Sequence, residues 1–498
     1  MAHASSSGSP QPSSNTPFDL RLRELSLDEF RRLEESQSPL YNRDLAPVPV
    51  SERTWTTYNF AALWISMAHC IPTYMLASGL IDSGMSWMQA LFTILLGNVI
   101  VLVPILLNSH PGTRYGIPFP VLLRSSYGSY GANLPALMRA IVACGWFGIN
   151  AWIGGAVLHT FFGSIIPGWS HLLGSTPIGG YQPTQWLSFL LFWGLNIFVI
   201  FRGMDLVRKL ENFAAPFVLL MAGILLAWAV QKANGLGPII DRPTTLTGAQ
   251  FWKVFPVALT GMVGFWATLS LNMPDFTRYG KSQRAQMIGQ TVALPTTMFG
   301  FSMMAVIITS ATSVVFGRTI WKPELLIGEL KDPLWVGLSA LTLVIATLAV
   351  NIAANVVSPA NDFANAWPKH IDFRRGALIT GIMGILCMPW KLTEDSHAYL
   401  VGWLVLYSGG LGAIAAIMVV DYWLIRKRSL KLYDLYVPDG SYRYRRGWNP
   451  VAVVATLVGC GLSWGGLLVP ALKGLYDFAW FVGFAAAGAV YYFGMRRT

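Results

Sequence analysis

Long apolar runs constrain this chain more than any other feature of its sequence. Twelve segments are apolar enough to cross a bilayer as one helix, which takes about 20 residues. They lie near 58–81, 86–107, 134–162, 184–201, 211–230, 252–273, 287–315, 334–357, 376–390, 398–424, 450–470 and 475–494. Of all 498 residues, 54% are hydrophobic and only 12% are charged. This balance excludes a disordered chain and disfavours a soluble enzyme. It predicts an all-α polytopic membrane protein with 12 transmembrane helices.

Positive charge indicates how these spans are oriented. The formal net charge is +11, and most of the 35 Lys and Arg residues lie in the N-terminal segment, in every second loop and at the C-terminus. Because cytoplasmic loops are enriched in Lys and Arg, we expect both termini to be cytoplasmic in a multi-pass protein of the plasma or inner membrane. The charge is thereby explained without a nucleic-acid partner.

Two of the predicted spans look interrupted. The first carries Pro72, which removes a backbone donor in mid-span, and the sixth carries Gly264 as a soft point before Pro274. Broken helices are tolerated in lipid only where they line protein or a cavity. Interrupted first and sixth spans are typical of transporters built from two inverted halves, with the substrate at the midplane. Two ordinary kinks would give the same pattern.

The polar residues near the middle of four of the spans are uncharged. Spans one, three, six and eight have no charged residue near their middles; they carry Trp146 with Asn150, Asn351 with Asn355, and Trp266. Each of the first two pairs is four apart, hence on one helix face. Amides offer donors and an acceptor, and rings offer stacking. The set predicts a site for a small, neutral, planar molecule, although buried Asn residues also join neighbouring helices.

Several short motifs support the same interpretation. They are Asn42–Pro47, Gly116–Pro120, Gly145–Asn150, Trp266–Ser270, Pro274–Arg278, Asn355–Pro359 and Asp421–Trp423. Together they resemble the nucleobase–cation symport family 1, whose members import nucleobases, hydantoins and allantoin. The segments Pro389–Leu392 and Tyr476–Gly483 look most like those of bacterial allantoin permeases.

The resemblance implies both a fold and a site. The fold would be a five-plus-five inverted-repeat, LeuT-like core followed by two C-terminal helices. Trp146 and Trp266 would hold the ligand ring between them, and Asn150 and Asn355 would meet its amide edges. The first-span position that carries an amide in hydantoin and allantoin members is Cys70 here. This departure leaves uracil-like and purine substrates open.

A second departure concerns the coupling ion. Sodium-coupled members have a Ser-Thr pair where this chain has Ala349 and Val350. A hard cation needs several oxygen ligands, and mainly backbone carbonyls near Ser66 and Ala346 would remain. We therefore expect proton coupling, with sodium symport as the alternative. His69, near the break of the first span, is the candidate proton carrier because His titrates near physiological pH. A His bonded to a backbone carbonyl is the structural alternative.

His159 and Asp275 are further candidates for carrying the proton. A membrane enzyme would need a cluster of His, Asp or Glu, or a nucleophile with a base, yet the seven His are scattered. A channel usually shows a symmetric filter. No metal site and no cofactor other than the coupling ion is expected.

The overall prediction is a secondary active transporter, not an enzyme. It would import a neutral heterocycle, either an allantoin- or hydantoin-type ureide or a nucleobase such as uracil, with purine or cytosine as alternatives. The expected partners are this substrate and membrane lipid, with no nucleic acid and no obligate protein partner. Four regions follow: a cytoplasmic tail (1–57), a ten-span core (58–424), a cytoplasmic loop (425–449), and the last two spans with a short tail (450–498).

Overall fold

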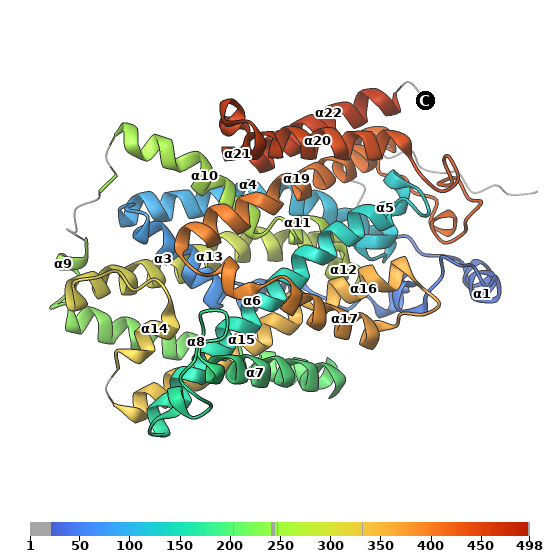
Figure 1. Cartoon of the computed structure of the whole chain (residues 1–498). Coiled ribbons are helices and arrows are strands. Elements are labelled where there is room, and N and C mark those ends of the chain that lie inside the picture. The colour runs from blue at the N-terminus through green and yellow to red at the C-terminus, as the bar shows by residue number, and fades with distance from the viewer. Residues whose placement is uncertain (1–20, 203, 241–244, 247, 331, 497–498) are drawn as a thin grey trace, which may run out of the picture.

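The computed structural model describes residues 21–496 except 203, 241–244, 247 and 331, with backbone alone for 204–216. The described residues form helices joined by loops and isolated β-bridges, without a strand. The long helices lie side by side across the molecule (Figure 1). Such an arrangement suits a bilayer because each helix satisfies its own backbone hydrogen bonds.

Every predicted span coincides with a helical segment. In chain order these are α2 (Thr57–Ala68) with α3 (Ile71–Asp82), α4 (Trp87–Tyr115), α6 (Asn133–Ile165), α7 (Pro183–Arg202), α8 (Met204–Lys232), α10 (Ala249–Phe265) with α11 (Leu269–Asn272) and α12 (Pro274–Thr277), α13 (Gln283–Phe316), α15 (Pro333–Asn355) with α16 (Val357–Ala366), α17 (Phe373–Leu386), η4 (Ala398–Val405) with α19 (Leu406–Val419) and η5 (Val420–Ile425), α20 (Pro450–Leu468), and α21 (Lys473–Asp477) with α22 (Ala479–Met495). Within the described residues, seven of these segments are long and apolar enough to span a membrane, and three more are bent pairs. The predicted all-α polytopic fold is confirmed.

Both expected interruptions are present. The first span bends by 56° between α2 and α3, and the sixth bends by 40° between α10 and α11. The first break lies at His69 and Cys70, ahead of the predicted Pro72, which sits in the first turn of α3. Proline is tolerated there because that turn needs no N–H donor. In the sixth span the helix continues through Gly264 and ends at Phe265.

The N-terminal segment contains one α-helix, α1 (Leu27–Glu35), within the described residues. It begins at Leu27 because Ser26 caps it: Ser26 Oγ accepts from the Glu29 N–H at 3.2 Å, and the Glu29 carboxylate accepts from the Ser26 N–H at 2.9 Å. This reciprocal pair is a capping box. Residues 1–20 of the predicted N-terminal tail lie outside the described residues.

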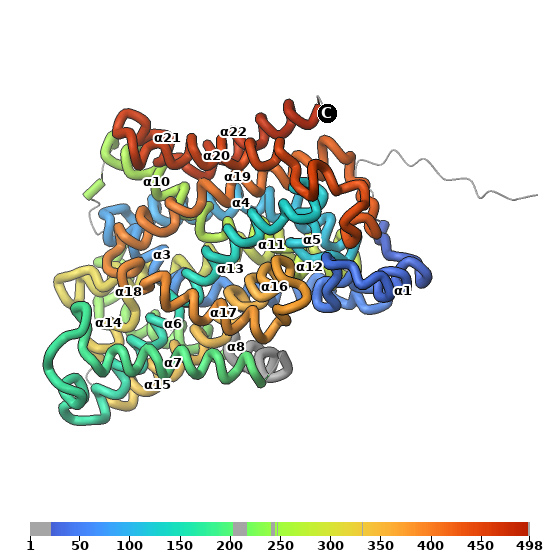
Figure 2. The backbone as a smooth tube through the Cα atoms, turned by 45° about the vertical axis from the view of Figure 1, so that its right-hand side comes forward, coloured from blue at the N-terminus to red at the C-terminus, as the bar shows by residue number. Residues whose placement is uncertain are grey.

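The last two spans pack along one edge of the bundle. Figures 1 and 2 both show α20 and α22 beside α19. Small residues allow this close approach: a Cβ on Gly483 would lie 2.2 Å from the Gly409 carbonyl oxygen. Membrane helices commonly meet at such small residues because lipid supplies no hydrophobic driving force between them.

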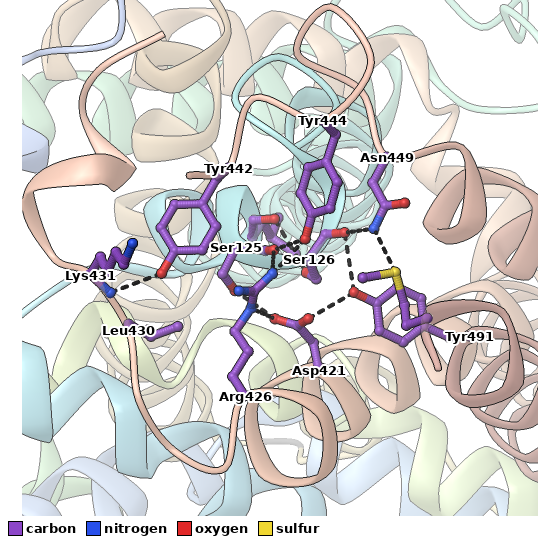
Figure 3. Close-up of polar contacts among 12 residues, drawn as sticks. Ser125, Ser126, Asp421, Arg426, Leu430, Lys431, Tyr442, Tyr444, Asn449 and Tyr491 are labelled. Atoms are coloured by element: carbon purple, nitrogen blue, oxygen red, sulfur yellow. Dashed lines mark hydrogen bonds and ion pairs between the residues drawn. The ribbon is translucent and has the colours of Figure 1, made fainter. Parts of the chain in front are cut away.

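A polar network joins α5 (Phe119–Tyr127) to this C-terminal part of the chain (Figure 3). The buried Asp421 carboxylate accepts hydrogen bonds from Ser125 Oγ at 2.9 Å, Tyr491 Oη at 2.8 Å and Arg426 Nε at 2.7 Å. Arg426 also donates to the Ser125 carbonyl at 2.6 Å. A buried carboxylate is stable when it is paired and hydrogen-bonded in this way. The network therefore holds α5 against the tenth and twelfth spans.

Candidate functional site

A small cavity lies between the two broken spans and the third and eighth spans. Its volume is about 30 Å³, room for about two water molecules. It is lined by Met67, Cys70, Pro72, Trp146, Asn150, Phe265, Trp266, Thr268, Leu269, Val350, Ala354 and Asn355. All five predicted substrate-binding residues are in this set, and none of the lining residues is charged. A heterocyclic ring is larger than this space, so ligand entry requires the lining to move apart.

The third span presents an indole and an amide on one face. Trp146 and Asn150 are both buried, and Asn150 Nδ2 donates to the Trp146 carbonyl at 3.0 Å. This bond fixes the amide one helical turn beyond the indole. Asn150 Oδ1 is buried without a hydrogen-bond partner in the structure. Because an unpaired buried acceptor is costly, this atom is well suited to meet a ligand N–H group.

The sixth span places its indole in the break itself. Trp266 follows the last residue of α10 and meets Trp64 edge-on, with ring centroids 5.1 Å apart. Phe265 separates the two indoles, edge-on to Trp146 at 5.4 Å and to Trp266 at 4.8 Å. Trp266 Nε1 is buried without a partner. The two indoles therefore line one cavity but do not yet enclose a ring-sized space.

The eighth span ends its long helix at the site. Asn355 is the last residue of α15, and its Nδ2 donates to Asn351 Oδ1 at 3.1 Å. Asn351 Nδ2 in turn donates to Asn196 Oδ1 at 3.1 Å. Asn351 therefore joins neighbouring spans, as buried Asn residues in membrane helices often do. Asn355, in contrast, lines the cavity.

Three of the five predicted coupling-ion residues line a cavity, and they do not all share the same one. His69, Cys70 and Ala346 line a second, largely apolar cavity of about 80 Å³, whereas Val350 lines the first. Ser66 and Ala349 line neither cavity. His69 Nδ1 lies 2.5 Å from the Ile65 carbonyl oxygen, so one ring nitrogen is engaged within its own helix. Cys70 lines both cavities, and its Sγ is 3.3 Å from Thr73 Oγ1.

The two further proton-carrier candidates lie away from the first-span break. His159 lies in the last two turns of α6, and its Nδ1 accepts from Nε1 of Trp169, a residue beyond the end of that helix, at 3.0 Å. Asp275 is buried in α12, where it accepts from the Phe119 N–H at 2.9 Å and from the Ser358 hydroxyl. The structure therefore brings neither of them to the cavities between the broken spans.

Several contributors to the site, three of which make notable contacts, were not anticipated from the sequence. Phe265 and Thr268 line the cavity beside Trp266; their place next to the predicted break was the available signal. Tyr407, in the tenth span, accepts a hydrogen bond from Trp146 Nε1 at 3.3 Å. No sequence pattern pairs these two residues, because the contact depends on how the third and tenth spans pack.

Two broken spans around an uncharged cavity, within a bundle of membrane-length helices, define a membrane transporter of the inverted-repeat class. Residues 47–483 match the family model described as permease for cytosine/purines, uracil, thiamine, allantoin. The chain belongs to this permease family.

Individual relatives cover nearly the whole chain. The allantoin permease of Bacillus subtilis (strain 168) is 42% identical over 93% of this chain and 96% of its own length. The purine-uracil permease NCS1 of Arabidopsis thaliana is 43% identical over 92% of this chain and 78% of its own.

A solved structure shares the fold. Mhp1, a nucleobase-cation-symport-1 family transporter in a closed conformation with bromovinylhydantoin bound, has a TM-score of 0.75 and 25% identity, covering 92% of this chain and 96% of its own. The LeuT-like, inverted-repeat fold expected from the sequence is thereby confirmed, as is the family.

Proposed function

We propose that this protein imports a small, neutral, planar heterocycle by secondary active transport coupled to protons. The substrate is an allantoin- or hydantoin-type ureide or a nucleobase such as uracil. Trp146 and Trp266 stack on its ring, Asn150 and Asn355 meet its N–H and C=O edges, and Cys70 faces the remaining edge.

The observation that carries this proposal is the composition of the cavity between the broken spans. Two indoles, two amides and no charged side chain line it. Aromatic faces attract flat rings, and amides pair with both donors and acceptors. Moving an ion into an uncharged site within the membrane is costly. The relatives named for allantoin and for purine and uracil support the same class of substrate.

Competition for uptake tests the substrate class. Labelled allantoin and labelled uracil are offered to cells producing the protein, with unlabelled rings as competitors. We expect saturable uptake of at least one label, and neutral rings should compete at least tenfold better than charged relatives such as orotate or allantoate, because the cavity holds no countercharge. Equal competition by the charged compounds would contradict a neutral-ligand site. Uptake that never saturates would point to a channel.

Proton coupling is proposed from residues of the first and eighth spans. Ala349 and Val350 bring no side-chain oxygen, and a hard cation needs several oxygen ligands. His69 offers a titratable ring at the break. We expect initial uptake to change less than twofold when potassium replaces sodium, and to fall at least tenfold with a protonophore. Complete dependence on sodium would refute this part of the proposal.

The topology belongs to the same proposal. We place residues 1–57 and 425–449 in the cytoplasm, residues 58–424 as the transporting core, and 450–498 as two additional spans, all in the plasma or inner membrane. The excess of Lys and Arg in alternate loops supports this orientation.

A further inference from the structure

The tenth span turns a row of aromatic residues toward the cavity wall. Tyr399, Trp403 and Tyr407 follow each other at four-residue intervals, the first two within the wider π-helical turns of η4. All three rings meet Trp146 nearly perpendicularly, with centroids 6.1, 6.0 and 6.5 Å away. The tenth span therefore packs three aromatic rings against the Trp146 indole.

Only the hydroxyl of Tyr407 adds a hydrogen bond to this indole. It accepts from Trp146 Nε1 at 3.3 Å and donates to the Gly264 carbonyl oxygen at 2.8 Å. The same carbonyl accepts from the Ala267 N–H at 2.9 Å, in the turn where the sixth span breaks. One buried hydroxyl therefore connects the third-span indole to the broken sixth span.

The sixth and tenth spans pack closely together beside this hydrogen bond. A Cβ on Gly264 would lie 2.7 Å from the Leu404 carbonyl oxygen, so the backbones are nearly in contact there. Tyr407 follows Leu404 by three residues, which places it on the same side of its helix. The Tyr407 hydroxyl both accepts and donates a hydrogen bond. Its two partners lie in the third and sixth spans, and together they fix its position.

We propose that Tyr407 is a positioning residue: its hydroxyl holds the Trp146 indole in the orientation that receives the ligand ring. This inference rests on the proposed function, because it assigns Trp146 to ligand stacking. An indole without this bond would have to be ordered at the moment of binding, which weakens affinity. The effect should fall on ligand binding rather than on the transport cycle.

The test compares two Tyr→Phe substitutions in the full-length protein. Tyr407→Phe removes the bridging hydroxyl and keeps the ring. Tyr476→Phe is the matched control: Tyr476 is similarly buried, 7% exposed against 6% for Tyr407. Its hydroxyl also donates to a tenth-span carbonyl, that of Val401, at 3.0 Å. It is not among the rings that surround Trp146. Binding of labelled allantoin and labelled uracil to purified protein, maximal uptake in proteoliposomes, and the thermal midpoint are measured for each.

We expect Tyr407→Phe to raise Kd about fivefold to tenfold, the effect of about one hydrogen bond, with maximal uptake within twofold of the unmodified protein. Tyr476→Phe should leave Kd within twofold. The inference is overturned if Tyr407→Phe leaves Kd within twofold, or if both variants shift Kd and the thermal midpoint alike, which would indicate a purely structural role. If the unmodified protein takes up neither ring, the proposed function itself fails and this inference falls with it.

Discussion

Replacing Trp266 by alanine is expected to lower uptake at subsaturating substrate to below about one-tenth of normal. The substitution removes one of the two indoles that line the cavity, and with it the stacking surface inside the break of the sixth span. Truncating a buried aromatic anchor at a binding site typically costs about 2 kcal/mol or more, or about 30-fold in affinity. Initial rates measured across a range of substrate concentrations separate this loss of affinity from a loss of turnover.

Trp252→Ala provides the control for Trp266→Ala. Trp252 lies in the same helix, α10, but is 64% exposed on the outside of the bundle. We expect this variant to transport normally and both variants to reach the membrane in equal amounts. Normal transport by Trp266→Ala, at equal abundance, would show that the ring is not held there.

The second large effect is expected on folding, from Arg139→Met. Arg139 and Asp362 are fully buried and pair at 3.5 Å, joining the N-terminal part of α6 to α16. Asp275 acts electrostatically on both. Without the guanidinium, two buried carboxylates would lose their shared cation. Breaking a buried pair from one side costs about 3–5 kcal/mol, a large share of the usual net stability of about 5–15 kcal/mol.

The folded fraction after extraction in detergent and the thermal midpoint measure this effect. Arg443→Met is the control, since its pair with Asp439 is solvent-exposed on both sides and such pairs contribute about 0–1 kcal/mol. Adding Asp362→Asn to Arg139→Met should restore part of the lost stability, because one of the unpaired charges is removed. A fully stable Arg139→Met protein would contradict the argument.

Much of the architecture followed from local patterns. Each span is a run of apolar residues about as long as the bilayer is thick, and the helices found in the structure coincide with these runs. Both interruptions were predicted, although the first lies at His69 and Cys70 rather than at Pro72. Proline marked the region correctly, but it is accommodated at a helix start, so the break precedes it.

Part of the candidate site could also be predicted from local sequence patterns. Trp146 with Asn150, and Asn351 with Asn355, were paired by helical spacing alone. That spacing did not distinguish Asn355, which lines the cavity, from Asn351, which bonds to Asn196 on another span. The ligand, the coupling ion and the roles of these residues stay predictions.

The protein class, the positions of the apolar helices and the polar residues available to a site could be predicted from the sequence, because apolar length and helical periodicity are properties of short segments. Which of those residues come into contact could not be predicted and is seen in the folded chain. Tyr407 bonds Trp146 from 261 positions away, Arg139 pairs with Asp362 across 223, and Asp421 reaches Ser125 across 296. Such contacts depend on how all the helices pack together, and helices bury compatible faces in many possible arrangements until packing selects one.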